Sequence, residues 1–172
     1  MSKMTSHAPR AILATLLLGL CLQADAGTPA PAGSDHADAG LRTVLAYELA
    51  DIRSRDDLAL HLRRARGHSP LDALSPASRE RFLDSLVFNA NGLAQYRFDD
   101  LQRELTVTQA YRILRLFGAG ESAPFLHAMH PRDAVDAGIQ SFMRIEDHEG
   151  GKCAGPGTCE MLYPHYICTS NC

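Results

Sequence analysis

Hydrophobic residues recur at helical spacing along most of the chain, most densely between residues 75 and 118. Ser75 followed by Pro76 predicts a helix start, because serine caps a helix and proline suits its first position, where the missing N–H has no partner to lose. One apolar face follows, made of Phe82, Leu83, Leu86 and Val87. Asn91 and Gly92 tolerate a left-handed backbone, so the helix is predicted to end near them.

The second half of this stretch predicts one extended segment and two helices. Residues 94–98 alternate apolar and polar side chains, a pattern typical of a strand. Asp99 is predicted to cap the next helix, and Thr106 with Gln109 forms a capping box for the one after it. That last helix carries an apolar face and is predicted to end at Gly118. The face consists of Ala110, Ile113, Leu114 and Phe117.

Further helices are predicted on both sides of this stretch. A helical period begins at Leu41, and its apolar residues are Leu41, Val44, Leu45, Leu49 and Ile52. Ser54 with Asp57 predicts the next helix start and Gly67 its end. Beyond residue 118, a short helix is predicted at 125–130, and Val135, Ile139, Phe142 and Met143 share helical spacing. Apolar residues at this period normally face a core.

No second strand is predicted to pair with the extended segment 94–98. The predicted fold class is therefore all-α: a small, single-domain helical bundle with a disulfide-bonded, loop-rich C-terminal tail. The predicted helical domain spans residues 41–148 and the tail residues 149–172.

The N-terminus predicts export. Lys3 and Arg10 precede the apolar run 11–22, and Ala24-Asp25-Ala26 is a small-x-small cleavage site, so residues 1–26 are predicted to be a signal peptide. Residues 27–40, rich in Ala, Pro, Gly and Asp, are predicted to be a disordered arm. Cys21 suggests a lipoprotein signal, but it follows a leucine rather than a small residue, so no stable membrane anchor is expected after cleavage.

Charge and motifs exclude several functions. The formal net charge is −3, whereas nucleic-acid binders normally carry a basic excess, so no nucleic-acid partner is expected. Five arginines suggest an anion or phospholipid contact, but a solvated helix end with Asp56 and Asp57 as partners suits them better; they are Arg53, Arg55, Arg63, Arg64 and Arg66. There is no G-x-S-x-G elbow, phosphate-binding glycine loop or dinucleotide fingerprint. No catalytic residue and no cofactor is predicted, and the chain is not expected to be an enzyme.

Four cysteines lie in the last 21 residues, in the pattern C-x5-C-x8-C-x3-C. They are Cys153, Cys159, Cys168 and Cys172. An even number of cysteines in an exported chain predicts disulfides, because the compartment is oxidising and a short Gly- and Pro-rich segment cannot build its own core. Two disulfides are expected. Four cysteines allow three pairings, among which the sequence does not choose.

A metal site is the alternative for this segment. Six thiol and imidazole ligands occur there: His148, Cys153, Cys159, His165, Cys168 and Cys172. Zinc or copper would suit them, but neither C-x2-C nor H-x3-H spacing appears. His127 and His130, with Met129 between them, form a second and weaker candidate for copper. The prediction is therefore disulfides, with no metal-binding residue assigned.

These observations predict a periplasmic or secreted binding module whose partner is an envelope or extracellular protein. An inhibitor or an immunity protein would fit this description, although no residue specifies either. A metal-dependent protein using the C-terminal His and Cys residues is the alternative. A third hypothesis is a precursor that releases a cysteine-rich peptide by cleavage after Gly151, suggested by the double glycine at 150–151.

Overall fold

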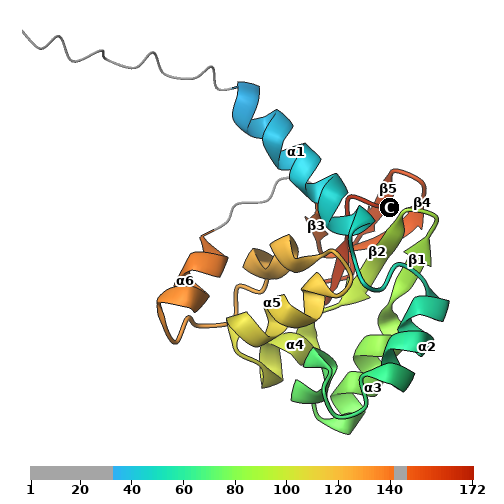
Figure 1. Cartoon of the computed structure of the whole chain (residues 1–172). Coiled ribbons are helices and arrows are strands. Elements are labelled where there is room, and N and C mark those ends of the chain that lie inside the picture. Colours follow the sequence, from blue (N-terminus) through green and yellow to red (C-terminus); the bar gives the residue numbers. More distant parts are fainter. Residues whose placement is uncertain (1–32, 142–146) are drawn as a thin grey trace, which may run out of the picture. The chain divides into compact units, whose positions relative to one another are not determined.

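A computed structural model describes residues 33–141 and 147–172 (Figure 1). Its elements in chain order are α1 (Gly33–Glu48), α2 (Arg55–Arg64), the 3-10 helix η1 (Pro70–Ala73), α3 (Pro76–Ser85), β1 (Val87–Asn89), β2 (Gly92–Arg97), α4 (Asp99–Glu104), α5 (Val107–Arg115), the 3-10 helix η2 (Gly120–Phe125), α6 (Ala134–Gln140), β3 (His148–Glu149), β4 (Gly151–Gly155), β5 (Thr158–Met161) and β6 (Tyr166–Cys168). The predicted signal peptide, Phe142 and Met143 lie outside the described residues.

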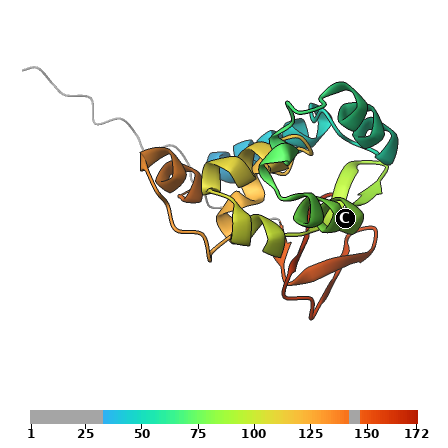
Figure 2. The ribbon, with the colours of Figure 1, turned by 90° about the horizontal axis from the view of Figure 1, so that it is seen from below.

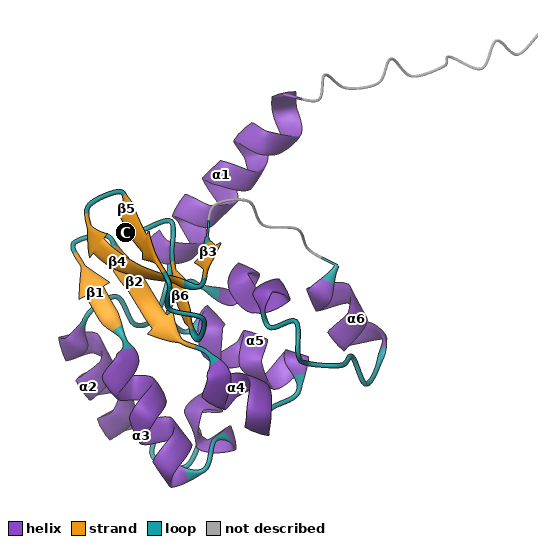
Figure 3. Ribbon diagram, turned by 180° about the vertical axis from the view of Figure 1, so that it is seen from behind, coloured by secondary structure: helices purple, strands orange, loops and turns teal. Residues whose placement is uncertain are grey.

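The predicted all-α class is wrong, because the protein contains two antiparallel sheets beside its helices. Strand β2 pairs with β1 on one side and with β6 on the other, and β3 pairs with β6, giving the order β1-β2-β6-β3 (Figure 3). Strands β4 and β5 form a separate hairpin. The partners of β2 are only three residues long, too short to show the alternation that reveals a strand in sequence. The fold class is therefore mixed α and β.

The predicted end of the helix that starts at Pro76 is also wrong. Helix α3 ends at Ser85. Ala90 and Asn91 form the turn between β1 and β2, and Gly92 is the first residue of β2, paired with Asn89. Gly92 has a φ of +120°, and the Asn91 N–H donates to the Asn89 side chain at 2.9 Å. Asn and Gly are common where a chain reverses, and here the reversal lies between two strands rather than at a helix end.

Several predicted helix starts and stops are confirmed. The Ser75 hydroxyl caps α3, with Pro76 at its first position. In α5, the Thr106 hydroxyl accepts from the Gln109 N–H at 3.1 Å, and the Gln109 side chain accepts from the Thr106 N–H at 2.9 Å. Gly118 follows with a φ of +76°. Local hydrogen bonding sets these boundaries, so the sequence predicts them correctly.

The core lies between β2 and the helices α3 and α5, and Figures 1 and 3 show these elements side by side. Phe82 of α3 packs edge-on against Tyr96 of β2, with ring centroids 6.3 Å apart, and against Phe117, at 6.0 Å. The buried hydroxyl of Tyr96 is 2.7 Å from the Ser122 hydroxyl. The predicted α5 face is fully buried, namely Ala110, Ile113, Leu114 and Phe117.

Helix α1 does not follow the expectation that its apolar face is core. It begins at Gly33, and Thr43 and Tyr47 are its buried contacts with the body. Ile52, which follows the helix, is buried. The other residues predicted to share its apolar face are exposed, namely Leu41, Val44, Leu45 and Leu49. Gly118 allows the end of α1 to pack closely on the body, because a Cβ there would lie 2.7 Å from the Ala46 carbonyl oxygen.

Carboxylates connect the helices of the body. Asp100 of α4 is 1% exposed and forms ion pairs with Arg81 and Arg103. Glu104 accepts from the Ser75 N–H at 2.7 Å and from the Ser78 hydroxyl at 2.5 Å, which ties α4 to the start of α3. Asp99, predicted as a cap, is instead the first residue of α4. These carboxylates therefore have structural partners.

The segment between α5 and α6 differs from its prediction as well. A short helix was expected over residues 125–130, but η2 spans Gly120–Phe125 and ends where that helix should begin. Helix α6 starts at a well-formed cap, where the Asp133 carboxylate accepts from the N–H groups of Val135 and Asp136 at 2.9 and 2.8 Å. Ile139 is buried as its spacing predicts, whereas Val135 is exposed.

Candidate functional site

The four C-terminal cysteines lie at disulfide distance in two pairs. Cys153 pairs with Cys172 and Cys159 with Cys168, at Cα–Cα separations of 5.5 and 5.9 Å. Both separations suit a disulfide. Disulfides persist in oxidising compartments, so these bonds indicate a location outside the cytoplasm.

The Cys159–Cys168 disulfide joins β5 to β6 and closes the loop between these two strands. Backbone hydrogen bonds fix the inner side of this loop. The Tyr163 N–H donates to the Gly150 carbonyl at 3.0 Å, and the Gly150 N–H donates to the Tyr166 carbonyl at 2.8 Å. The His165 carbonyl accepts from the Phe98 N–H of the body at 2.9 Å. The loop is therefore attached to both the β4 strand region and the main sheet.

A lysine and two tyrosines hold the same loop from the side. The Lys152 ammonium lies 4.2 Å from the ring centroid of Tyr163 and 4.3 Å from that of Tyr166. Both distances are within the range of a cation–π interaction. The two rings also meet edge to face, with centroids 6.4 Å apart. This contact adds a further restraint to the part of the loop that follows its tip.

The tip of the loop presents apolar side chains to solvent. Leu162 is 91% exposed and Met161 is 48% exposed. Leu162 has a φ of +106°. In the part of the chain that the structure describes, it is the only residue other than glycine with a positive φ. Such a conformation costs about 1–3 kcal/mol and persists only where the surroundings impose it. A strained and exposed leucine on a restrained loop is the feature that we take as the candidate site, and we call Met161 and Leu162 the loop tip.

The cysteines and His165 were candidates from the sequence, but the loop tip was not. The available signal was the apolar run Met161-Leu162-Tyr163 between two cysteines, which reads as ordinary core in sequence. His165 is exposed and reaches the body through its backbone carbonyl. The backbone strain at Leu162 has no signature in the sequence.

The alternative metal ligands do not come together. Among the described residues, the potential ligand atoms that cluster are the sulfurs of Cys159, Cys168 and Cys172, within 4.8 Å of one another, and no histidine joins them. The Cys172 sulfur also lies 3.1 and 3.2 Å from the carbonyl oxygens of Gly155 and Thr158. All three sulfurs belong to the two disulfides, and a disulfide sulfur is not the thiolate that binds a metal.

The other candidate histidines have separate surroundings. The His127 ring nitrogen lies 3.3 Å from a Glu149 carboxylate oxygen, and its ring meets Phe125 edge to face with centroids 6.4 Å apart. His130 is exposed. Met129, the expected sulfur ligand between them, is buried in the core. The two histidines and this methionine therefore do not form a common site.

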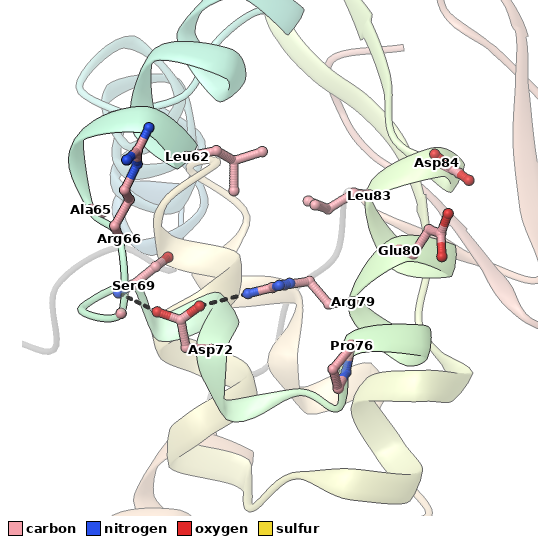
Figure 4. Close-up of a pocket in the computed structure, with 11 residues that line it drawn as sticks. Leu62, Ala65, Arg66, Ser69, Asp72, Pro76, Arg79, Glu80, Leu83 and Asp84 are labelled. Atoms are coloured by element: carbon pink, nitrogen blue, oxygen red, sulfur yellow. Dashed lines mark hydrogen bonds and ion pairs between the residues drawn. The ribbon is translucent and has the colours of Figure 1, made fainter.

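A groove of about 620 Å³ between α2, η1 and α3 is a weaker candidate (Figure 4). Figure 4 shows Leu62 and Leu83 facing each other across it, with Arg79 reaching Asp72 at 2.6 Å. That ion pair satisfies both charges, and the groove is open to solvent. A second groove, of about 260 Å³, runs between the exposed face of α1 and Tyr111 and Arg115 of α5.

The chain matches no known family model, no curated protein and no solved structure in the comparisons made. Within residues 33–141 and 147–172, none of the helices is both long and apolar enough to cross a membrane.

Proposed function

We propose that this protein is a periplasmic or secreted binding module that contacts a protein partner through the loop tip, Met161 and Leu162. The observation that carries the proposal is the 91% exposure of Leu162 together with its φ of +106°. The disulfides support export, and the N-terminal signal pattern supports the same route.

Leucine is a costly residue at this position if the fold is the only requirement. Its exposed side chain gains nothing from burial, and its backbone is strained. Glycine adopts a positive φ without strain, so it would serve the fold alone better. A leucine in this place therefore supports a role in contact with a partner.

The restraints on the loop favour tight binding. Association usually has to order flexible loops, which costs free energy. Here the Cys159–Cys168 disulfide, the hydrogen bonds to Gly150 and the Lys152 contact have already ordered the loop in the free protein. Such preorganisation reduces the cost of binding.

The shape of the tip indicates how the partner receives it. A segment that adds a strand to a partner's sheet must be extended, and the φ of Leu162 is incompatible with an extended backbone. The tip therefore fits a partner that offers an apolar pocket for a single side chain. This mode is compatible with an inhibitor or an immunity protein, which block a surface on an extracellular or envelope target.

Site-specific photo-crosslinking tests the proposal. A photoreactive residue replaces Glu160, which is exposed beside the tip, in the full chain expressed in its native host. Unlabelled full-length protein then competes for the resulting adduct. Wild type should compete, whereas Leu162→Ala should compete at least about tenfold more weakly, since buried interface anchors typically contribute 2 kcal/mol or more.

Val135→Ala is the matched control, because Val135 is an exposed apolar residue of α6 remote in sequence from the tip. It should compete as well as wild type. Equal competition by Leu162→Ala and wild type would contradict the role of the tip. Folding of each competitor is checked by its thermal transition.

A further inference from the structure

Three of the four cysteine sulfurs form one cluster, the fourth is bonded to one of them, and more than one pairing is within reach. The sulfurs of Cys159, Cys168 and Cys172 lie within 4.8 Å of one another. Cys153 and Cys159 face each other as paired residues across the β4–β5 hairpin. Directly opposite residues in antiparallel strands have Cα atoms about 4.5–5.5 Å apart, which suits a disulfide.

We propose that the two disulfides exchange to a second isomer, Cys153–Cys159 with Cys168–Cys172, when an external thiol catalyses the reaction. This regulation rests on the proposed binding role of the loop tip. In the structure, the Cys159–Cys168 bond closes the loop that carries Leu162. In the second isomer, one bond lies across the β4–β5 hairpin and the other lies near the C-terminus, so the loop has no covalent closure.

The exchange proceeds in three balanced thiol–disulfide steps. A catalyst thiolate attacks the Cys159 sulfur, forms a mixed disulfide and releases Cys168 as a thiolate. The Cys168 thiolate attacks the Cys172 sulfur, forms Cys168–Cys172 and releases Cys153 as a thiolate. The Cys153 thiolate then attacks the Cys159 sulfur of the mixed disulfide, forms Cys153–Cys159 and releases the catalyst thiolate. No net oxidation or reduction occurs.

The exposure of Cys159 makes it the point of attack in this route. Cys159 is half-exposed, so an external thiol can reach it, whereas Cys168 and Cys172 are buried. Along the route, Cys172 is never a thiolate, because it passes directly from one disulfide to the other.

The third possible pairing is less favourable. It would join Cys153 to Cys168, but the residue of β4 that lies against Cys168 is Gly151, whose added Cβ would be 3.1 Å from the Cys168 Cβ. Cys153 is two residues further along the strand, about 6–7 Å away at the usual rise per residue. The geometry therefore selects one alternative isomer rather than two.

Two-cysteine variants of the full chain test this inference. Cys153→Ala with Cys159→Ala leaves the Cys168 and Cys172 pair, and Cys168→Ala with Cys172→Ala leaves the Cys153 and Cys159 pair. Each is incubated in a redox buffer of reduced and oxidised glutathione, and intact mass after thiol alkylation counts the free thiols. Both variants should form an internal disulfide at least about tenfold faster than Cys159→Ala with Cys172→Ala, which leaves the disfavoured pair.

Wild-type protein provides a second measurement that does not depend on how the variants fold. Fragmentation mass spectrometry of the intact chain, after incubation with reduced glutathione and acid quenching, identifies the linked residues. Appearance of Cys153–Cys159 and Cys168–Cys172 is the expected result. A chain that keeps its original pairs throughout, together with free thiols in both predicted two-cysteine variants, would overturn the inference.

The outcome of the crosslinking experiment is independent of the outcome of the disulfide-exchange experiments. Detection of the second isomer without any adduct that depends on Leu162 would leave the exchange established and contradict the proposed binding role. An adduct that depends on Leu162, with no second isomer, would do the reverse.

Discussion

The helical body and the hairpin β4–β5 maintain their structures by different means. The body buries large side chains completely, including Phe82, Tyr96 and Phe117. Between residues 148 and 161, by contrast, the buried residue is Gly151, and the rest are half-buried or exposed. This segment shares two disulfides with the C-terminus, and it lies apart from α6 in Figure 2. Covalent bonds therefore allow it to present apolar residues that a noncovalent core would have to bury.

The largest expected effect is in the body. Phe82→Ala removes an aromatic side chain with no exposed surface that packs against Tyr96 and Phe117. The free energy of unfolding should fall by about 3–5 kcal/mol, as measured in urea. The tail should keep its disulfides, as read by alkylation of the folded protein. A loss below about 1 kcal/mol would show that this core is not what stabilises the body.

The next largest loss of stability is expected at Gly118, where α1 packs on the body. Gly118→Ala puts a Cβ 2.7 Å from the Ala46 carbonyl oxygen and from the Tyr47 Cα, at a φ of +76°. The expected loss is about 2–3 kcal/mol, since both the conformation and the contact are unfavourable. Gly138→Ala is the control, because nothing lies within 4 Å of its added Cβ inside α6, and it should stabilise slightly. Equal effects at the two glycines would refute the close approach of α1.

Removing the loop disulfide tests whether a covalent bond maintains the structure of the C-terminal segment. Cys159→Ala with Cys168→Ala opens a loop of sequence separation 9 and should reduce the free energy of unfolding by about 2–3 kcal/mol. The near-ultraviolet circular dichroism of the body should persist, whereas amide hydrogen exchange should rise at Tyr163 and Tyr166. Protection that stays unchanged at these two amides would show that noncovalent contacts alone hold the loop.

Acid should weaken the body through Asp136. This buried carboxylate accepts from the Thr108 hydroxyl at 2.6 Å and from the Thr108 and Arg132 N–H groups at 2.8 and 3.1 Å. The bond from the Thr108 side chain is the main reason why the pKa of Asp136 lies below its ordinary value of 3.8. The folded pKa is depressed, so the stabilisation is fully present above the unfolded pKa of about 3.8 and is lost as pH falls from there through the folded pKa.

Urea unfolding from pH 6 down to about pH 3 measures this dependence. Asp136→Asn should show a shallower decline in stability below pH 4 than wild type. Asp84→Asn, which changes an exposed carboxylate of α3, is the control and should follow the wild-type curve. Identical slopes for Asp136→Asn and wild type would exclude this carboxylate as a source of acid sensitivity.

The smallest expected effect has the opposite sign. Leu162→Gly should raise the free energy of unfolding by a few tenths of a kcal/mol up to about 1 kcal/mol, because the release of strain exceeds the entropy that glycine adds to the unfolded chain. The same variant should fail to compete in the crosslinking experiment. Destabilisation by Leu162→Gly would show that this leucine serves the fold, and would remove the main support for the proposed contact.

Features set by neighbouring residues could be predicted from the sequence, and features set by distant partners could not. The caps at Ser75 and at Thr106 with Gln109 depend on residues within one helical turn. The partners of β2 come from residues 87–89 and 166–168, which no local pattern connects. The cysteines of the candidate site were predicted, but the pairing required the strands to be in place.

The sequence by itself determined the helix starts at residues 55, 76 and 107, the extended segment at 94–98, the export signal pattern and the composition of a disulfide-bonded tail. These depend on capping, periodicity and cysteine count, all of which are local or compositional. Only the tertiary structure decided that Leu41 and Leu45 of α1 are exposed, that β6 joins β2, and that Leu162 is presented on a strained loop. Burial, strand pairing and backbone strain each depend on contacts between residues far apart in the chain.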